Sequence, residues 1–456
     1  MTQYTVRLKD GWKFTDGTPV TAESFTKAWS YVANAKNAQK CSSFFSMIKG
    51  YDELQDPDKL QGDEQLSGLN VVDDKTFTVD LNSPDSIFPV KVGYIAFAPL
   101  PESFYKDPKA FGENPVGNGM YKFTHWDHNS QIELAKNADY KGVQKVANDG
   151  VTFKIYTSAD SAYSDVQGGN LDVTGTIPAS AIKTFEKDSS VEAYNKAGSV
   201  IQAFTIPSDY EHWKVDTEEG HLRRLALSMA IEREEIVEKV LGGTGTVATD
   251  FSSPAIPGYA DNLKNSENLK YNPAKAKELW KKADAISKYD GKLVFSYDAD
   301  KGFKPVFEAI VNSANNVLGE VGLKATANPV PTFQEFRNSI DERSMKGAFR
   351  TGWTPDYPSI EDYLYQIYDS AAADGKGAND GDYRNADVDA LFTKAMGITN
   401  QDERNKVYQD AEVILLDELP SIPLYYSNAV GVAAAGVKGF TMDWQNQPIF
   451  NELSKS

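Results

Sequence analysis

The sequence of 456 residues predicts a mixed α/β protein. Three observations support this fold class. Residues 4–8 have an alternating strand pattern that leads through a turn into a helical pattern. Two alternating runs near residues 121–135 are typical of a hairpin. Helical and strand patterns then alternate between residues 217 and 416. At roughly 100 to 200 residues per domain, the length allows two or three domains.

The first strand and helix have clear local signals. Residues 4–8 alternate in polarity, and Asp16-Gly17 supplies a turn. Thr21 is a suitable N-cap, with Ser24 as a weak substitute for the Glu or Gln of a capping box. The residues that follow on one helical face are apolar: Phe25, Ala28, Trp29 and Val32.

The same rules predict further strands and helices along the chain. The predicted strands are 76–81, 121–126, 131–135, 151–156, 292–297 and 347–353. The predicted helices are 161–169, 222–230, 233–241, 272–283, 304–318 and 404–416.

The composition excludes several classes of protein. The 65 acidic residues outnumber the 47 basic ones, and the formal net charge of −18 argues against a nucleic-acid partner, which requires clustered cations. Apolar runs are too short for a transmembrane helix, which needs about 18 consecutive residues. The single cysteine, Cys41, cannot form an intramolecular disulfide.

No motif predicts catalysis. The sequence has no Gly-x-Ser-x-Gly elbow and no cysteine with nearby histidine support. His125 and His128 invite a metal-binding hypothesis, but a solvated hairpin turn explains them more simply. Residues 242–245 lack the end of a phosphate loop and are better interpreted as a helix C-cap, and Glu361-Asp362 is interpreted as a pair on a helix surface. We therefore expect a protein that is not an enzyme and has no metal or cofactor.

Residues 348–358 are the candidate binding segment. Arg350, Trp353 and Asp356 set a cation, an aromatic ring and a carboxylate near the end of a predicted strand and the turn that follows it. A ligand could be held there. The alternative is that Arg350 faces solvent, Trp353 fills the core and Asp356 organises the turn.

Five segments together resemble one known family. They are residues 4–29, 114–121, 136–140, 223–231 and 419–426, in the family's order along the whole chain. In these segments the chain resembles the family 5 extracellular solute-binding proteins of ABC importers. The resemblance implies a two-lobed fold of the periplasmic-binding-protein type (type II), with an extra inserted domain and a hinge between the lobes.

The resemblance also implies a domain division and a location. Residues 1–118 would form the extra α/β domain, residues 119–208 with 425–456 a discontinuous first lobe, and residues 209–424 the second lobe. The sequence begins without a leader, and we expect the N-terminal part of the first lobe to be missing. The expected location is extracytoplasmic, in the periplasm or at the outer face of the cell membrane, with a lipid anchor in the full-length protein.

Family members that bind oligopeptides imply roles for particular residues. Asp356 matches an aspartate that meets the α-amino group of the peptide, and Arg350 an arginine that can meet the carboxyl end of a short peptide. These members have a segment of the form Arg-x-Gly-Trp-x-x-Asp-Tyr, which residues 350–357 resemble and to which Trp353 and Tyr357 belong. Arg343 and Phe336 resemble other cleft positions.

The resemblance thus predicts a monomer that captures short peptides and delivers them to a membrane ABC permease. Two alternatives remain open. The same fold could bind an oligosaccharide, a nickel complex or another small solute, and abundant aromatic residues could stack on sugar rings. A hydrolase acting on the same ligands is the third possibility, although no nucleophile and base are evident.

Overall fold

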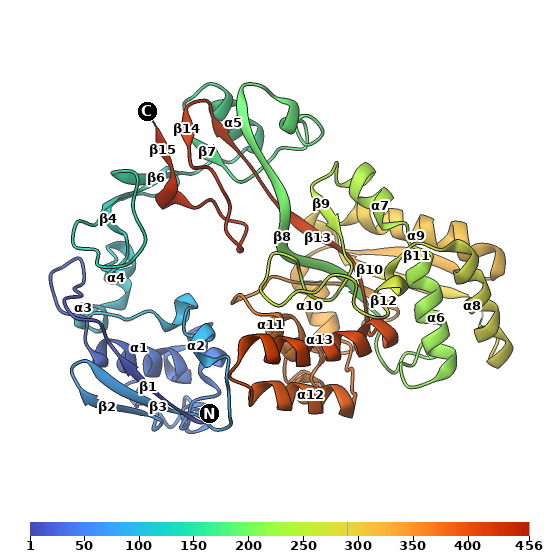
Figure 1. Ribbon diagram of the computed structural model, residues 1–456, viewed down its shortest axis with the longest axis horizontal. Coiled ribbons are helices and arrows are strands. Elements are labelled where there is room, and N and C mark those ends of the chain that lie inside the picture. The colour runs from blue at the N-terminus through green and yellow to red at the C-terminus, as the bar shows by residue number, and fades with distance from the viewer. Residues whose placement is uncertain (290, 456) are drawn as a thin grey trace. The chain divides into compact units, whose positions relative to one another are not determined.

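The computed structural model describes residues 1–289 and 291–455. Helices and strands are mixed along the chain, which confirms the α/β class (Figure 1). The chain forms two compact units. The first consists of residues 1–172, 434–441 and the C-terminal residues from 449, and the second of residues 173–433 and 442–448. The division into three domains stays a prediction.

The first unit begins with a small antiparallel sheet in the order β1-β3-β2 and a helix packed against it. These elements are β1 (Gln3–Arg7), α1 (Ala22–Ala33), β2 (Leu69–Asp73) and β3 (Thr76–Asp80). Helix α1 begins as predicted, because Thr21 and Ser24 form a capping box. Trp29 of α1 is buried, packs against Phe77 of β3, and donates its indole N–H to the Phe97 oxygen at 2.9 Å. This aromatic core joins the helix to the sheet.

The rest of the first unit contains short helices and a second antiparallel sheet. Its elements are α2 (Phe88–Lys91), α3 (Glu102–Lys106), α4 (Pro108–Glu113), β4 (Tyr121–Asp127), β5 (Gln131–Lys136), β6 (Gly150–Lys154), α5 (Ala159–Gln167), β14 (Val437–Lys438) and β15 (Ser454–Lys455). Strands β4 and β5 form the predicted hairpin, and β6 pairs with β5.

The second unit is built on one mixed sheet in the order β11-β10-β12-β8-β13-β7, with β9 paired to β13. Its strands are β7 (Val173–Thr174), β8 (Val191–Thr205), β9 (Gly245–Val247), β10 (Lys292–Asp298), β11 (Lys324–Val330), β12 (Ala348–Trp353) and β13 (Ser421–Ala434). Strand β10 runs parallel to β11 and β12, whereas β12 is antiparallel to β8. The carboxyl ends of β10 and β12 therefore lie at the same edge of the sheet.

Helices accompany this sheet. They are α6 (Glu218–Met229), α7 (Arg233–Glu235), α8 (Pro273–Ile286), α9 (Lys304–Leu318), α10 (Phe333–Asp341), α11 (Ile360–Tyr368), α12 (Ala386–Met396) and α13 (Gln401–Glu418). The helix predicted over 233–241 forms as the short α7 followed by a π-helical turn at residues 236–240. None of the described helices has the length and apolar character needed to span a bilayer.

Arg224 ties two neighbouring strands together. Its side chain is fully buried, and it donates hydrogen bonds to the Ile206 oxygen just after β8 (3.1 Å) and to the Leu419 oxygen just before β13 (3.0 Å). Burial lowers the pKa of Arg224 to about 9. A buried cation without partners would be costly, so these hydrogen bonds hold the end of β8 close to the start of β13.

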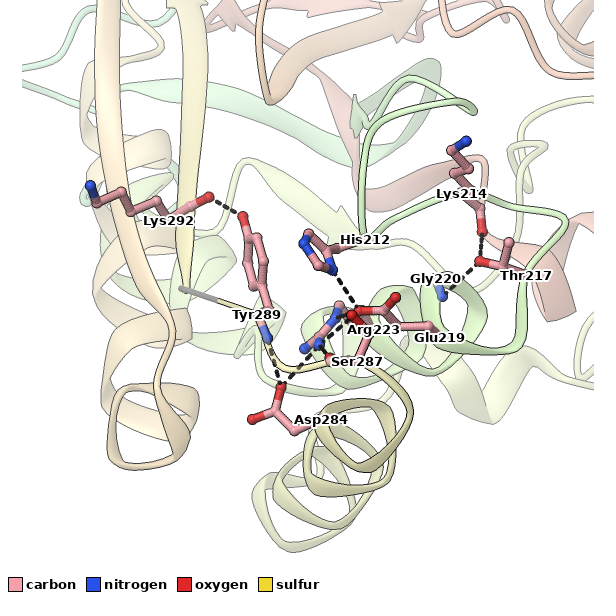
Figure 2. A network of polar contacts seen from close by, with 10 residues as sticks. All are labelled: His212, Lys214, Thr217, Glu219, Gly220, Arg223, Asp284, Ser287, Tyr289 and Lys292. Atoms are coloured by element: carbon pink, nitrogen blue, oxygen red, sulfur yellow. Dashed lines mark hydrogen bonds and ion pairs between the residues drawn. The ribbon is translucent and has the colours of Figure 1, made fainter.

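Arg223 ties α6 to α8, and Figure 2 shows its partners converging on the guanidinium. Its Nη2 atom donates to Glu219 Oε1 and to Asp284 Oδ1, both at 2.9 Å. The guanidinium also lies 4.7 Å from the ring centre of Trp280 and 5.0 Å from that of Tyr289. This cluster fixes the end of α8 shortly before β10 begins.

Candidate functional site

The candidate site lies at the edge of the sheet where β10 and β12 end. Phe295 and Ser296 of β10 pair with Ala348 and Phe349 of β12. Arg350 is the next residue of β12, and Asp298 is the last residue of β10. In open α/β sheets, ligands bind at the carboxyl ends of the strands. The local sequence therefore brings charged side chains to the edge where a ligand is expected.

Arg350 is held on several sides. Its side chain is 19% exposed, and its Nε atom lies 3.8 Å from Oδ1 of Asp298. Its Nη2 atom donates a hydrogen bond to Gln202 Oε1 at 3.4 Å, and its guanidinium lies 4.1 Å from the ring centre of Phe303. Burial lowers the pKa of Arg350, and the charge of Asp298 opposes this shift. The expectation that Arg350 simply faces solvent does not describe this environment.

Gly352 leaves room for the strand next to it. It pairs with Gln202 of β8, and a Cβ atom at this position would lie 2.7 Å from the Ile201 oxygen and 2.9 Å from Gln202 Oε1. Both distances are shorter than such contacts allow. The glycine of the Arg-x-Gly-Trp motif therefore lets the Gln202 side chain lie across β12 and reach Arg350.

Asp362 fixes the turn that carries Asp356. Its Oδ2 atom accepts hydrogen bonds from the Asp356 backbone N–H at 2.7 Å and from the Trp353 indole N–H at 3.1 Å. The Asp362 side chain is buried, and burial raises its pKa to about 7, with a further contribution from the Glu361 carboxylate. One carboxyl group thus fixes the backbone of Asp356 and the ring of Trp353.

The Asp356 carboxylate itself is left without a partner. The residue is half-buried, and burial raises its pKa. Within residues 1–289 and 291–455, no group donates a hydrogen bond to this carboxylate or forms an ion pair with it. A half-buried carboxylate on a fixed turn is suited to bind a cation.

The other three predicted site residues have structural surroundings. Tyr357 is 1% exposed and donates its hydroxyl to Glu361 Oε2 at 2.6 Å. Phe336 is also 1% exposed and packs with Phe349 in the core. Arg343 forms a two-pronged ion pair with Asp382, with both N···O distances at 2.8 Å. Their roles toward a ligand stay predictions.

Three residues of this region were not predicted as parts of the site: Gln202, Asp298 and Asp362. Asp298 directly follows the predicted strand 292–297, which is a signal that sequence reasoning could have used. The interpretation of Glu361-Asp362 as a surface pair is wrong, because both side chains are buried. The short helix α11 turns that face toward the protein interior.

The other candidate groups are in ordinary positions. His128 lies at the β4–β5 hairpin, contacts Glu113 at 2.8 Å and stacks on Trp126. Gly242 and Gly243 both have positive φ angles and follow the π-helical turn, as expected of a helix end. The part of the chain that the structure describes contains no cluster of three or more side chains suited to hold a metal ion.

Comparisons with known proteins identify the family of the chain. The sequence profile described as "Bacterial extracellular solute-binding proteins, family 5 Middle" matches residues 1–375. The dipeptide-binding protein DppE of Bacillus subtilis is 27% identical over 445 residues, covering 96% of this chain and 78% of that protein. The oligopeptide-binding protein OppA of the same organism is 26% identical over 461 residues, covering 98% and 81%.

A solved structure shows the same fold. The murein tripeptide-binding protein MppA, in its unliganded open form, superposes with a TM-score of 0.82 at 22% identity and covers 100% of this chain and 86% of its own. The predicted two-lobed fold class is therefore confirmed. The relatives are substrate-binding proteins of ABC transporters, which are not enzymes. Because the family profile covers most of its length, the chain belongs to family 5 of the bacterial extracellular solute-binding proteins.

Proposed function

We propose that this protein captures short peptides outside the cytoplasm by their α-amino group and delivers them to a membrane ABC permease. The observation that carries the proposal is the Asp356 carboxylate. It is half-buried and has no partner among the described residues, while Asp362 holds the backbone N–H of the same residue. Relatives named as dipeptide-binding and oligopeptide-binding proteins support the peptide as ligand.

An ammonium group explains this carboxylate better than a neutral solute does. A charged group that loses water needs an opposite charge and hydrogen bonds, and a peptide amine supplies both to Asp356. Trp353, fixed by the same Asp362 oxygen, adds a flat apolar surface beside the turn. A peptide backbone further supplies amides that pair with protein groups irrespective of the side chains.

Membership of the family supports the proposed partner and the proposed extracytoplasmic location. The protein acts outside the cytoplasm, held to the membrane by a lipid, and hands its ligand to the permease. The expected ligand-binding residues are Asp356, Arg350 and Trp353, with Tyr357, Arg343 and Phe336 shaping the site.

The first experiment is native mass spectrometry of the purified protein, followed by release of any bound ligand. Peptides of a few residues support the proposal. A released oligosaccharide or other non-peptide solute contradicts the proposal that the ligand is a peptide, and only the function of a solute-binding protein then remains.

The second experiment tests the amine directly. The protein is incubated with a pool of random tripeptides to pentapeptides, half with a free amine and half N-acetylated, the halves distinguished by isotope labels. We expect free amines to be enriched more than about tenfold in the bound fraction, because an unpaired half-buried carboxylate is costly. Asp356→Asn should abolish the enrichment, whereas Glu308→Gln, a substitution of an exposed acid on α9, should not. Equal binding of acetylated peptides would contradict the role of Asp356.

A further inference from the structure

Asp298 is a buried acid whose position calls for an explanation. Its side chain is 0% exposed, and neither carboxylate oxygen has a hydrogen-bond partner within residues 1–289 and 291–455. Among the described residues, Arg350 is the only cation in ion-pair range, with its Nε atom 3.8 Å from Oδ1 of Asp298. Burial raises the pKa of Asp298, and the positive charge of Arg350 opposes this shift.

Apart from Asp298, Arg350 has few polar partners. Its Nε atom is buried and makes no hydrogen bond with a described residue, and Nη2 contacts the neutral Gln202 at 3.4 Å. One face of the guanidinium lies over the ring of Phe303. Among the residues that the structure describes, Asp298 is therefore the only acid in ion-pair range of Arg350, and the two charges balance.

This balance changes what Arg350 can do for a ligand. A free guanidinium attracts a carboxylate strongly, since the planar fork matches two oxygens. A guanidinium that already has a buried counter-ion does not, because the incoming carboxylate must lose water beside the negative charge of Asp298. The N–H groups of Arg350 remain able to donate to the neutral oxygens of a peptide backbone.

We propose that Asp298 is a specificity-determining residue, which neutralises Arg350 from within the protein so that the site takes peptides irrespective of a free terminal carboxylate. This inference rests on the proposed function and names its substrate class. The ligands are peptides anchored by their amine, and the site accepts a C-terminal end that is free, amidated or extended by further residues. Arg350 binds the backbone of the ligand rather than its terminus.

The wild-type protein provides the first test. It is incubated with a pool of random tripeptides to pentapeptides, half as free acids and half as C-terminal amides with an isotope label. We expect the ratio of acid to amide in the bound fraction to stay within about threefold of that in the pool, because the charge of Arg350 is already balanced. Enrichment of the free acids by about tenfold or more overturns the inference.

The variant Asp298→Asn supplies the second test. It keeps the shape of the side chain and leaves the charge of Arg350 unbalanced, so the bound fraction should shift toward free acids by about tenfold. Asp300→Asn is the matched control, because it removes the same charge from an exposed neighbour, and its ratio should equal that of the wild type. Thermal melting shows whether each variant is folded. A folded Asp298→Asn protein with an unchanged ratio contradicts the inference.

The two proposals fail in different ways. Binding of free-amine peptides with a strong preference for free acids overturns the role of Asp298 and leaves the proposed function intact. A protein that binds no peptide from the pool in any form overturns both.

Discussion

At the scale of single residues, one buried carboxyl group organises the candidate site. Asp362 accepts hydrogen bonds from Asp356 and Trp353 through the same oxygen, and its other oxygen has no described partner. A carboxyl group in this position is more stable as the neutral acid, because burial disfavours its charge. The free energy of unfolding should therefore depend on the pH at which Asp362 loses its proton.

We expect Asp362 to make stability fall as the pH rises. The folded protein holds its proton up to about pH 7, whereas the unfolded chain releases it near pH 4, so between these values the unfolded state binds fewer protons. Asp362→Asn should flatten this dependence by up to about 1.4 kcal/mol per pH unit. Urea unfolding of both proteins at pH 5, 6 and 7 measures this change of the unfolding free energy with pH.

Glu412 also contributes to the pH dependence of the unfolding free energy. Burial raises its pKa to about 7 as well, so the Asp362→Asn protein should keep part of the slope. A variant whose unfolding free energy changes with pH as in the wild type would show that Asp362 is ionised in the folded protein.

At the scale of elements, buried arginines join helices to strands. Arg223 has two carboxylate partners, Glu219 and Asp284, which Figure 2 shows beside it, and two aromatic neighbours. An apolar residue in its place leaves both carboxylates without this buried cation. We expect Arg223→Met to lower the free energy of unfolding by about 3 kcal/mol.

The matched comparison is a surface ion pair between α8 and the turn that follows α9. Lys277 contacts Glu320 at 2.6 Å, with side chains 32% and 73% exposed. Lys277→Met should therefore cost less than about 1 kcal/mol, since solvent screens this pair. Urea unfolding of both variants decides between the two expectations, and equal losses would contradict a structural role of the buried cluster.

At the scale of the whole molecule, net charge should influence which peptides arrive fastest. The formal charge of −18 attracts cations over a distance of about 10 Å at 0.1 M salt. We expect trilysine to bind about tenfold faster than triglutamate at low ionic strength. Stopped-flow measurements at rising salt should show the two rates converging, and a ratio that salt leaves unchanged would point to contacts in the site instead.

The sequence by itself determined the local elements, the class of fold and the family. The capping box at Thr21, the β4–β5 hairpin and the strand before Asp356 all depend on neighbours a few residues apart, and the structure reproduces them. The motif that contains Arg350, Trp353 and Asp356 was also recognisable in the chain.

Only the tertiary structure decided the partners of those residues. Gln202 and Asp298 approach Arg350 from strands that are 148 and 52 residues away in sequence, and sheet pairing alone brings them there. Asp362 is polar and reads as a surface residue, yet the packing of α11 buries it. Burial and charge balance are set by groups that are distant along the chain, so local patterns identify the ligand-binding candidates while the fold sets their chemistry.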